Sequence, residues 1–546
     1  MKKMNIHFVI FLLAFLPFSE AIIAQDLAQQ IDVIMEKEYP ADGPGATILV
    51  AKNGKPIYRK AFGKANLELD VPMKPENVLE LGSITKQFTA VAILKLMEEG
   101  KLELEDPLSK FIPDYPGGKD IKIHHLLNHT SGIKSYTDMP TFFTMARTDM
   151  TPIALIGIFK GEPMEFAPGE KYKYNNSAYI LLGYIIEEVS NVSYEDYIKT
   201  NFFIPLGMKN SYYGSKSTLI PNRASGYQPT ENGFRNADYL SMTLPYAAGS
   251  LMSTVDDMLL WNQAVHNNTL ISEKNKKLAF ENYKLNDGKP IYYGYGWAVN
   301  EIGGTPTIEH GGGIFGYTTS GVYAPNENLY VIVLTNTNGK DPSSVALRAM
   351  ALALGKPLDQ NPVSLAEADL KQWTGSYQFD DIVRFVTLEN GTLYSQREGG
   401  TKLKLIPLAS DKFQFEDSFS AYSFEKEQGR KIAYFSDRIL KSKGVEAEIK
   451  PAEEKKTVKV PTEVLSTYVG TYQLQPGFNI EITKVENTIF GQGTGQPKFE
   501  LFAESPEKFF VKVVPASVVF NKNSQGEIES LTLLQGGQEM EGKKIK

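Results

Sequence analysis

Apolar and polar positions follow regular periods at the start of the chain. The segment Asp26–Tyr39 carries apolar residues at helical spacing, which predicts an amphipathic helix with one buried side. Two strand-like runs follow, Ala46–Ala51 and Pro56–Phe62, and they are joined at Asn53-Gly54. Because this dipeptide favours tight hairpin turns, we expect the two strands to pair.

Two later segments read as helices with little exposed surface. From Ser83 to Glu99 apolar residues lie around almost the whole helical circumference, and Gly100 gives an end signal. A second apolar helix is predicted over Ser177–Val189. Helices of this kind are buried in a large core.

Three strands and a helix are predicted near residue 350. The strands are Thr305–Glu309, Tyr317–Tyr323 and Leu329–Asn336, and the helix Ser343–Leu354 ends at Gly355. A hairpin, central helices and a final meander with a helix are typical of an α+β fold in which helices flank an antiparallel sheet. We predict that this unit spans residues 25–356.

Beyond Lys356 the sequence changes to short strands and turns, and it repeats. The motif LKQWTGSY, at residues 370–377, recurs as LSTYVGTY 95 residues later, and Phe424 is matched by Phe520. Two all-β units, barrels or sandwiches, are predicted over residues 357–450 and 459–546. The charged stretch Pro451–Val458 is the expected linker.

The N-terminus has the layout of a secretory signal peptide. Lys2 and Lys3 precede an apolar run from Phe8 to Phe18, and small residues follow at Ser19, Ala21 and Ala24. The alternative is a membrane anchor, but a spanning helix needs about 20 apolar residues. We predict a signal peptide over residues 1–24, export to the periplasm or the medium, and no stable membrane span.

Composition excludes several classes of function. Hydrophobic residues form 42% and charged residues 22% of 546, as in folded proteins. A net charge of −7 provides no basic surface for nucleic acid, and zero cysteines exclude disulfides and thiolate metal sites. His124, His125 and His129 lack a carboxylate at metal-ligand spacing, so we read them as structural. No metal and no cofactor are predicted, and the oligomeric state stays open.

Four Ser-x-x-Lys pairs place a hydroxyl and an amine one helical turn apart, if they lie in helices. Only Ser83/Lys86 stands at the start of a long buried helix, where backbone N–H groups can stabilise an anion. Burial would also lower the pKa of Lys86 toward that of a usable base. The alternative is a capping serine followed by a surface lysine. The other pairs are Ser131/Lys134, Ser423/Lys426 and Ser505/Lys508.

Two further motifs follow in order, Tyr174-Asn175-Asn176 and His310-Gly311-Gly312. With SITK at residues 83–86, they resemble the penicillin-recognising serine hydrolases: class C β-lactamases, D-stereospecific aminopeptidases, related esterases and low-molecular-weight penicillin-binding proteins. The phrases HHLLNHTSGI, AAGSLMSTVDDM, YGYGW and EHGGG are similar to this family as well. The resemblance implies a β-lactamase/DD-peptidase-like sheet over roughly residues 30–356.

The resemblance implies roles for seven residues. Ser83 is the acylated nucleophile, Lys86 its proton partner, and Tyr174 a general base or acid whose phenolate a cationic Lys86 would favour. Asn176, His310, Gly312 and Gly313 bind substrate, with the N–H groups of Ser83 and Gly313 forming an oxyanion hole. Taken alone, Tyr174 reads as a buried aromatic, Asn176 as a helix cap, and His310 as a strand-end histidine bonded to Tyr174.

His310 departs from the Lys-Thr-Gly element of class C β-lactamases. Histidine is only partly charged near neutrality, so it offers a weaker anchor for a substrate carboxylate. We predict an exported peptidase or amidase for short peptides, with D-residues suggested by the two β units, which are similar to the D-aminopeptidase architecture. An esterase or a weak β-lactamase of the same fold is the near alternative. A catalytically inert binding protein is the alternative of another class.

Overall fold

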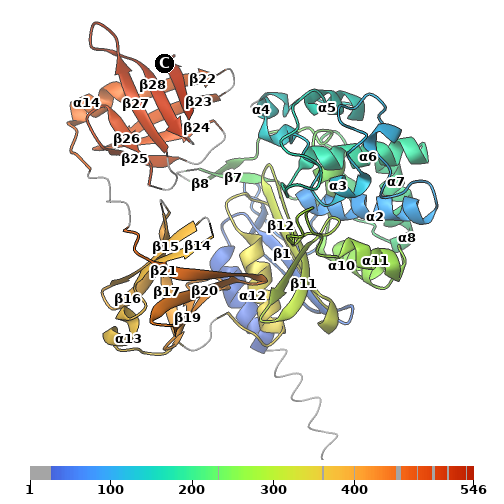
Figure 1. Cartoon of the computed structure of the whole chain (residues 1–546). Coiled ribbons are helices and arrows are strands. Elements are labelled where there is room, and N and C mark those ends of the chain that lie inside the picture. Colours follow the sequence, from blue (N-terminus) through green and yellow to red (C-terminus); the bar gives the residue numbers. More distant parts are fainter. Residues whose placement is uncertain are drawn as a thin grey trace, which may run out of the picture. The chain divides into compact units, whose positions relative to one another are not determined.

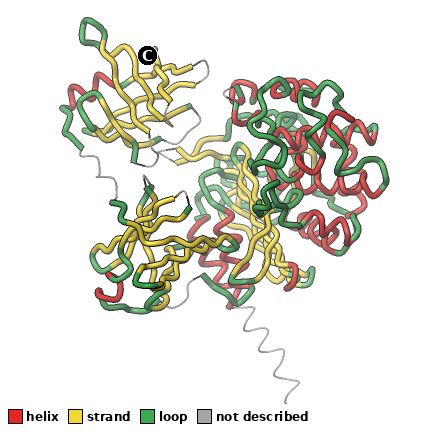
Figure 2. Tube along the Cα trace, in the orientation of Figure 1, coloured by secondary structure: helices red, strands yellow, loops and turns green. Residues whose placement is uncertain are grey.

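The computed structural model describes residues 26–139, 141–230, 233–358, 362–380, 382–398, 400–450, 457–475, 478–494, 498–512, 516–535 and 538–545. The predicted signal peptide and most of the predicted linker lie outside these residues. The chain divides into two compact units (Figures 1 and 2). The first consists of Met1–Met139 and Ala146–Leu358, and the second of Asp359–Lys546 with Pro140–Met145, which include α4 (Phe142–Met145).

The first unit is built on a six-stranded antiparallel sheet with the order β10-β11-β12-β13-β1-β2. The predicted hairpin and meander are confirmed, and they join because β1 pairs with β13, so that Ala46 lies opposite Thr335. Asn53 and Gly54 have φ angles of 52° and 73°, as their turn requires. The strands are β1 (Ala46–Lys52), β2 (Lys55–Phe62), β10 (Ala298–Ile302), β11 (Thr305–Ile314), β12 (Tyr317–Ala324) and β13 (Leu329–Thr335).

Helices cover both faces of this sheet. Every residue of β13 is buried, although antiparallel strands commonly have one solvated face, because α12 (Pro342–Ala353) and the helix of residues 26–38 lie on one side and the other helices on the opposite side (Figure 1). The larger helices on that second side are α2 (Thr85–Glu98), α6 (Asn176–Ser190) and α10 (Val255–His266). The predicted α+β fold is therefore confirmed.

Shorter elements connect these layers. They are β3 (Lys64–Asn66), β4 (Val71–Pro72), β5 (Leu79–Glu80), η1 (Gly82–Ile84), η2 (Leu108–Lys110), α3 (Ile123–Leu127), η3 (Tyr136–Asp138), α5 (Pro152–Phe159), α7 (Tyr194–Ile198), η4 (Lys199–Phe203), α8 (Ile204–Leu206), β6 (Tyr212–Tyr213), β7 (Tyr227–Thr230), β8 (Gly233–Asn236), α9 (Tyr246–Gly249), β9 (Leu251–Ser253), α11 (Glu273–Ala279) and η5 (Pro325–Glu327).

The second unit contains two closed barrels, each of eight antiparallel strands. The first comprises β14 (Gly375–Phe379), β15 (Ile382–Glu389), β16 (Thr392–Arg397), β17 (Lys402–Ala409), β18 (Lys412–Phe415), β19 (Ser420–Glu427), β20 (Arg430–Asp437) and β21 (Leu440–Ala447). The second comprises β22 (Gly470–Gln475), β23 (Phe478–Val485), β24 (Thr488–Gly493), β25 (Phe499–Ala503), β26 (Lys508–Phe510), β27 (Ala516–Lys522), β28 (Ile528–Gln535) and β29 (Gln538–Lys544).

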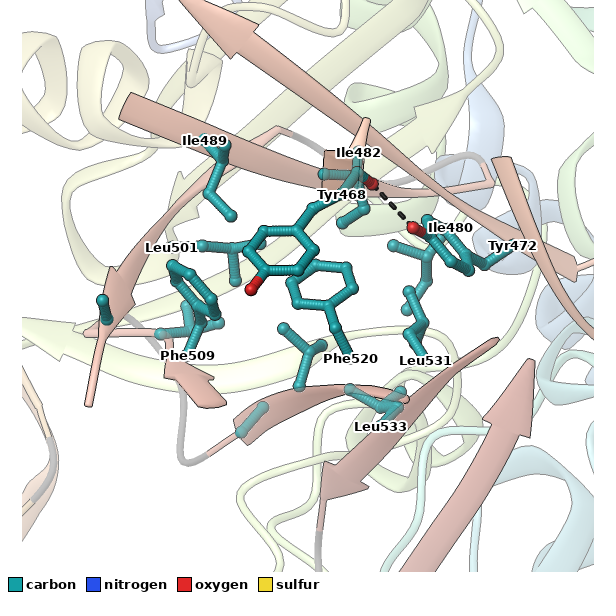
Figure 3. Close-up of a cluster of buried hydrophobic side chains, with 14 of the residues drawn as sticks. Tyr468, Tyr472, Ile480, Ile482, Ile489, Leu501, Phe509, Phe520, Leu531 and Leu533 are labelled. Carbon is teal, nitrogen blue, oxygen red and sulfur yellow. Dashed lines mark hydrogen bonds between the residues drawn. The ribbon is translucent and has the colours of Figure 1, made fainter. Parts of the chain in front are cut away.

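The sequence repeat corresponds to one aromatic arrangement used in both barrels. In the second, Tyr468 at the end of α14 (Thr462–Tyr468) stacks on Phe520 at 4.1 Å, and the Tyr472 hydroxyl donates to the Tyr468 carbonyl at 2.7 Å (Figure 3). In the first, Trp373 follows α13 (Glu367–Lys371) and stacks on Phe424. There the Tyr377 hydroxyl donates to the Trp373 carbonyl at 2.7 Å. The repeated residues therefore pack in the same way in the two cores.

Candidate active site

Ser83 lies in the 3₁₀ turn η1, directly before α2, rather than inside the long helix that the sequence predicted. Its side chain does not cap that helix, which excludes the capping interpretation. Thr319 of β12 donates to the Leu81 carbonyl at 2.8 Å and ties this turn to the sheet. A Cβ at Gly312 would lie 2.0 Å from the same carbonyl, so only glycine permits this close approach.

Lys86 is fully buried on the first turn of α2. Its Nζ lies 3.1 Å from Ser83 Oγ, 2.9 Å from Asn176 Oδ1 and 2.8 Å from the Ala248 carbonyl oxygen. Burial holds the pKa of Lys86 well below its ordinary value, because the charged form loses its solvation. The structure therefore brings together three residues that the sequence analysis selected from two separate motifs.

Asn176 is free for this contact because its neighbour caps the helix. The Asn175 side chain accepts the Ala178 N–H at 2.9 Å, so the capping role that Asn176 alone suggested belongs to Asn175. Asn176 Nδ2 donates to Thr137 Oγ1 at 3.0 Å. One N–H of this amide remains for another partner.

Tyr174 faces Ser83 and Lys86 from the segment before α6. Its ring centre lies 4.8 Å from Lys86 Nζ, and its hydroxyl is directed at Ser83. That hydroxyl is buried and forms no regular hydrogen bond with any described residue. Burial raises the pKa of Tyr174 above its ordinary value. The expected phenolate is thus wrong: both shifts favour a protonated phenol beside a neutral amine.

His129 holds the backbone on both sides of Tyr174. Its Nδ1 accepts the Asn175 N–H at 3.1 Å, and its carbonyl accepts the Lys173 N–H at 3.1 Å. The imidazole is fully buried, 4.3 Å from the Tyr174 ring. The sequence analysis read His129, like His124 and His125, as a structural residue and did not assign it to the site. The signal that could have identified it is its place in the family phrase HHLLNHTSGI.

His310 is buried on β11, and both of its ring nitrogens are engaged. Nε2 lies 2.8 Å from the Tyr293 hydroxyl, and Nδ1 lies 2.5 Å from the Gly311 carbonyl oxygen. A carbonyl only accepts, so Nδ1 carries the proton and Tyr293 donates to Nε2. The alternative in which His310 bonds to Tyr174 is excluded, because Tyr293 and the Gly311 carbonyl occupy both ring nitrogens and the Tyr174 hydroxyl has no hydrogen-bond partner among the described residues.

Burial is the main cause that lowers the pKa of His310 to about 4, because the charged imidazolium loses its solvation. This histidine is therefore neutral near pH 7, rather than partly charged as the sequence suggested. Tyr293 was missed as a site residue, although it lies in the phrase YGYGW.

Gly313 is the last of the predicted site residues. A Cβ added there would meet open space, whereas one added at Gly82 would lie 2.9 Å from the Gly313 nitrogen. Gly82 has φ of 55°, in the region that favours glycine. The chain before Ser83 and the end of β11 therefore run close together beside an open space.

With this geometry established, comparison with known proteins is decisive. A family model described as beta-lactamase matches residues 34–355. The chain belongs to the beta-lactamase family. Penicillin-binding protein 4* of Bacillus subtilis (strain 168) is 32% identical over 397 residues, covering 67% of this chain and 87% of that protein. Protein flp of Staphylococcus aureus (strain MW2) is 30% identical over 331 residues, and the chain spans 65% of its length.

Solved structures agree with this beta-lactamase assignment. The octameric penicillin-binding protein homologue from Pyrococcus abyssi is 30% identical with a TM-score of 0.54, over 77% of this chain and 99% of that one. The D-amino acid amidase from Ochrobactrum anthropi SV3 has a TM-score of 0.54, over 61% of this chain and 99% of that one. At 22% identity it shows the shared fold alone. A domain of unknown function (DUF3471) matches residues 454–544, which include the second barrel.

The other three Ser-x-x-Lys pairs of this beta-lactamase family member form no comparable contact. Lys134 Nζ binds the Glu165 carboxylate at 3.0 Å, and Ser423 lies in strand β19. Ser505 accepts the backbone N–H of Lys508 in a turn.

Within the described parts of the chain, no three His, Asp or Glu side chains lie close enough together to hold a metal ion. No helix among those residues is long and apolar enough to cross a membrane.

Proposed function

We propose that this protein is an exported serine hydrolase that forms an acyl-enzyme on Ser83. The observation that carries the proposal is the environment of Lys86. A neutral amine has two N–H donors and one lone pair. The Asn176 and Ala248 carbonyl oxygens accept the two N–H groups, which leaves the lone pair for the Ser83 hydroxyl at 3.1 Å.

Acylation then follows in balanced steps. Ser83 Oγ attacks the substrate carbonyl carbon while its proton passes to Lys86 Nζ. The N–H groups of Ser83 and Gly313 stabilise the oxyanion. When the tetrahedral intermediate collapses, the protonated Tyr174 hydroxyl gives its proton to the departing amine or alcohol, and the Lys86 ammonium restores it. Water releases the acyl group by the reverse path.

The substrate binds beside Asn176 and β11. The free Asn176 N–H donates to a substrate carbonyl, and Gly313, where an added Cβ would meet open space, lets the substrate lie close to the strand. Gly312 acts indirectly, because it lets the turn before Ser83 approach β11. His310 supplies no positive charge, because it is neutral and both of its nitrogens are engaged. We infer that the preferred substrates are short peptides, amides or esters without a carboxylate at this position.

Two further assignments follow from the relatives, and a third follows from the N-terminal sequence. The shared fold with a D-amino acid amidase favours amides of D-residues by analogy alone. The penicillin-binding relatives make slow acylation by β-lactams the second candidate. Export follows from the signal-peptide pattern of residues 1–24, and N-terminal sequencing of the secreted protein tests it.

A substrate panel tests the proposal. It contains D- and L-amino anilides, nitrophenyl esters and a chromogenic cephalosporin, with intact-mass detection of the acyl-enzyme. The wild type should turn over anilides or esters faster than the cephalosporin and gain the acyl mass. Ser83→Ala should do neither, while the matched control Ser131→Ala keeps both. An unmodified wild type that hydrolyses nothing would leave the inert binding protein as the better description.

His310→Lys tests the substrate preference separately. The added cation should improve substrates that carry the carboxylate, relative to their neutral analogues, by at most about 3 kcal/mol, the contribution of a charged hydrogen bond. The measurement is kcat/KM for paired substrates. Wild-type cephalosporin hydrolysis faster than every amide and ester would contradict the preference.

A further inference from the structure

The two barrels share one plan, so each interior position of one has a counterpart in the other. Tyr377 lies opposite Arg384 in the first barrel, and its repeat partner Tyr472 lies opposite Ile480 in the second. Arg384 and Ile480 therefore occupy the same place. Ile480 belongs to the apolar core of the second barrel (Figure 3).

The same comparison extends to a group of neighbouring positions. Across the strands, Arg384 pairs with Arg397 and Val386 with Ser395, whereas Ile480 pairs with Gly493 and Ile482 with Gly491. The pair Tyr422 and Phe435 corresponds in the same way to Val518 and Leu533. The second barrel thus fills this end of its interior without a polar side chain. The first places there Arg384, Ser395 and Tyr422, and the exposed Arg397 lies opposite Arg384 on the neighbouring strand.

The position of Arg384 is energetically unfavourable for a cation, because it is buried. The residue is 6% exposed, and its guanidinium carbon lies 3.9 Å from the centre of the Phe435 ring and 5.7 Å from that of Phe379. Among the residues that the structure describes, neither Arg384 nor Arg397 forms an ion pair. Directly opposed like charges on neighbouring strands destabilise a sheet, and an unpaired buried charge costs more still.

The polar groups nearby are hydroxyls. Tyr422 is buried, its hydroxyl lies 3.0 Å from Ser395 Oγ, and it also faces Arg384. Asp437 shares the inner face of β20 but accepts from Ser420 Oγ at 3.1 Å and pairs with neither arginine. A buried guanidinium, an exposed one, two hydroxyls and aromatic walls are therefore brought together, and no carboxylate among the described residues pairs with either arginine.

We propose that the first barrel binds a small monocarboxylate with an apolar body, its carboxylate held between Arg384 and Arg397 and its body against Phe435. The planar guanidinium matches a carboxylate with two parallel hydrogen bonds, and the aromatic walls favour an apolar body over a hydrated inorganic anion. This site is independent of the chemistry proposed for Ser83. The second barrel, with Ile480 and Gly493 in the same places, lacks it.

Calorimetric titration of the full-length chain with benzoate, with its neutral amide benzamide and with inorganic phosphate tests the site. Benzoate should bind with one-to-one stoichiometry, and the other two should bind at least about tenfold more weakly. Arg384→Ile, which copies the second barrel, should weaken benzoate binding by about tenfold or more. It should keep the unfolding midpoint and the wild-type rate of Ser83 acylation. Arg430→Ile removes an exposed arginine from the same barrel and should leave benzoate binding unchanged.

Arg397→Gln provides a second route, because this exposed side chain is removed without touching the core, and it should also weaken benzoate binding. Equal affinity for benzoate and benzamide would show an apolar crevice rather than a carboxylate site. No benzoate binding by the wild type, or full binding by both Arg384→Ile and Arg397→Gln, would overturn the proposal. A large fall in the unfolding midpoint of Arg384→Ile, with benzoate binding intact in Arg397→Gln, would show that Arg384 serves packing alone.

Discussion

Replacing His310 with glutamine should reduce the fall in the free energy of unfolding that occurs as the pH is lowered from 7 to 4.5. Unfolded, His310 binds a proton near pH 6.5, whereas in the folded protein its pKa is lowered to about 4. Between these values the unfolded state holds more protons, so the free energy of unfolding falls as the pH falls. The difference amounts to roughly 3 kcal/mol once the pH is below both pKa values, and to about 2 kcal/mol at pH 5.

Urea denaturation of the wild type and His310→Gln between pH 7 and pH 4.5 measures this difference. The buried His266, whose pKa is lowered to about 3, and the carboxylates contribute equally to both proteins, so they cancel. Glutamine keeps an acceptor for the Tyr293 hydroxyl, which limits the loss of stability at pH 7. Parallel profiles for the two proteins would mean that His310 titrates alike folded and unfolded. A neutral His310 beside the substrate would then be excluded.

Three further predictions concern the surroundings of the site. Gly312→Ala should unfold at lower temperature and lose activity, because its Cβ would lie 2.0 Å from the Leu81 carbonyl, while Gly313→Ala should fold normally, since its Cβ meets open space. His129→Phe should lower kcat more than it raises KM, because the ring remains but the acceptor for the Asn175 N–H is lost. A chain ending at Lys356 should fold alone and melt cooperatively, because the sheet is complete at β13 and α12 covers it before the barrels begin.

Each of these has a clear contrary result. Equal melting temperatures for Gly312→Ala and Gly313→Ala would contradict the close approach of β11 to the turn that carries Ser83. Loss of kcat that asparagine at position 129 does not partly restore would indicate damage to packing rather than a positioning role. An aggregated product from the shortened chain would place the boundary elsewhere than residue 356.

Local signals in the sequence were sufficient for most of the elements and for the identity of the site. The Asn53-Gly54 turn, the helix after Ser83 and the barrel repeat depend on neighbours in the chain, so spacing and residue type predict them. The motifs at Ser83, Tyr174 and His310 predicted which residues lie close together in the fold, because the family resemblance rests on these three motifs in this order along the chain. The helix bounds moved by a residue or two, which placed Ser83 in the turn before α2.

Tertiary structure alone decided the protonation and the partners of these residues. Burial by segments that are distant in sequence lowers the pKa of Lys86, raises that of Tyr174 and brings His310 against Tyr293. Spacing carries no measure of desolvation, which is why a phenolate at Tyr174 was expected. The sequence by itself determined which side chains the chain supplies to the candidate site, and the fold determined in which direction their pKa values shift, because solvent exclusion is a property of the packed molecule.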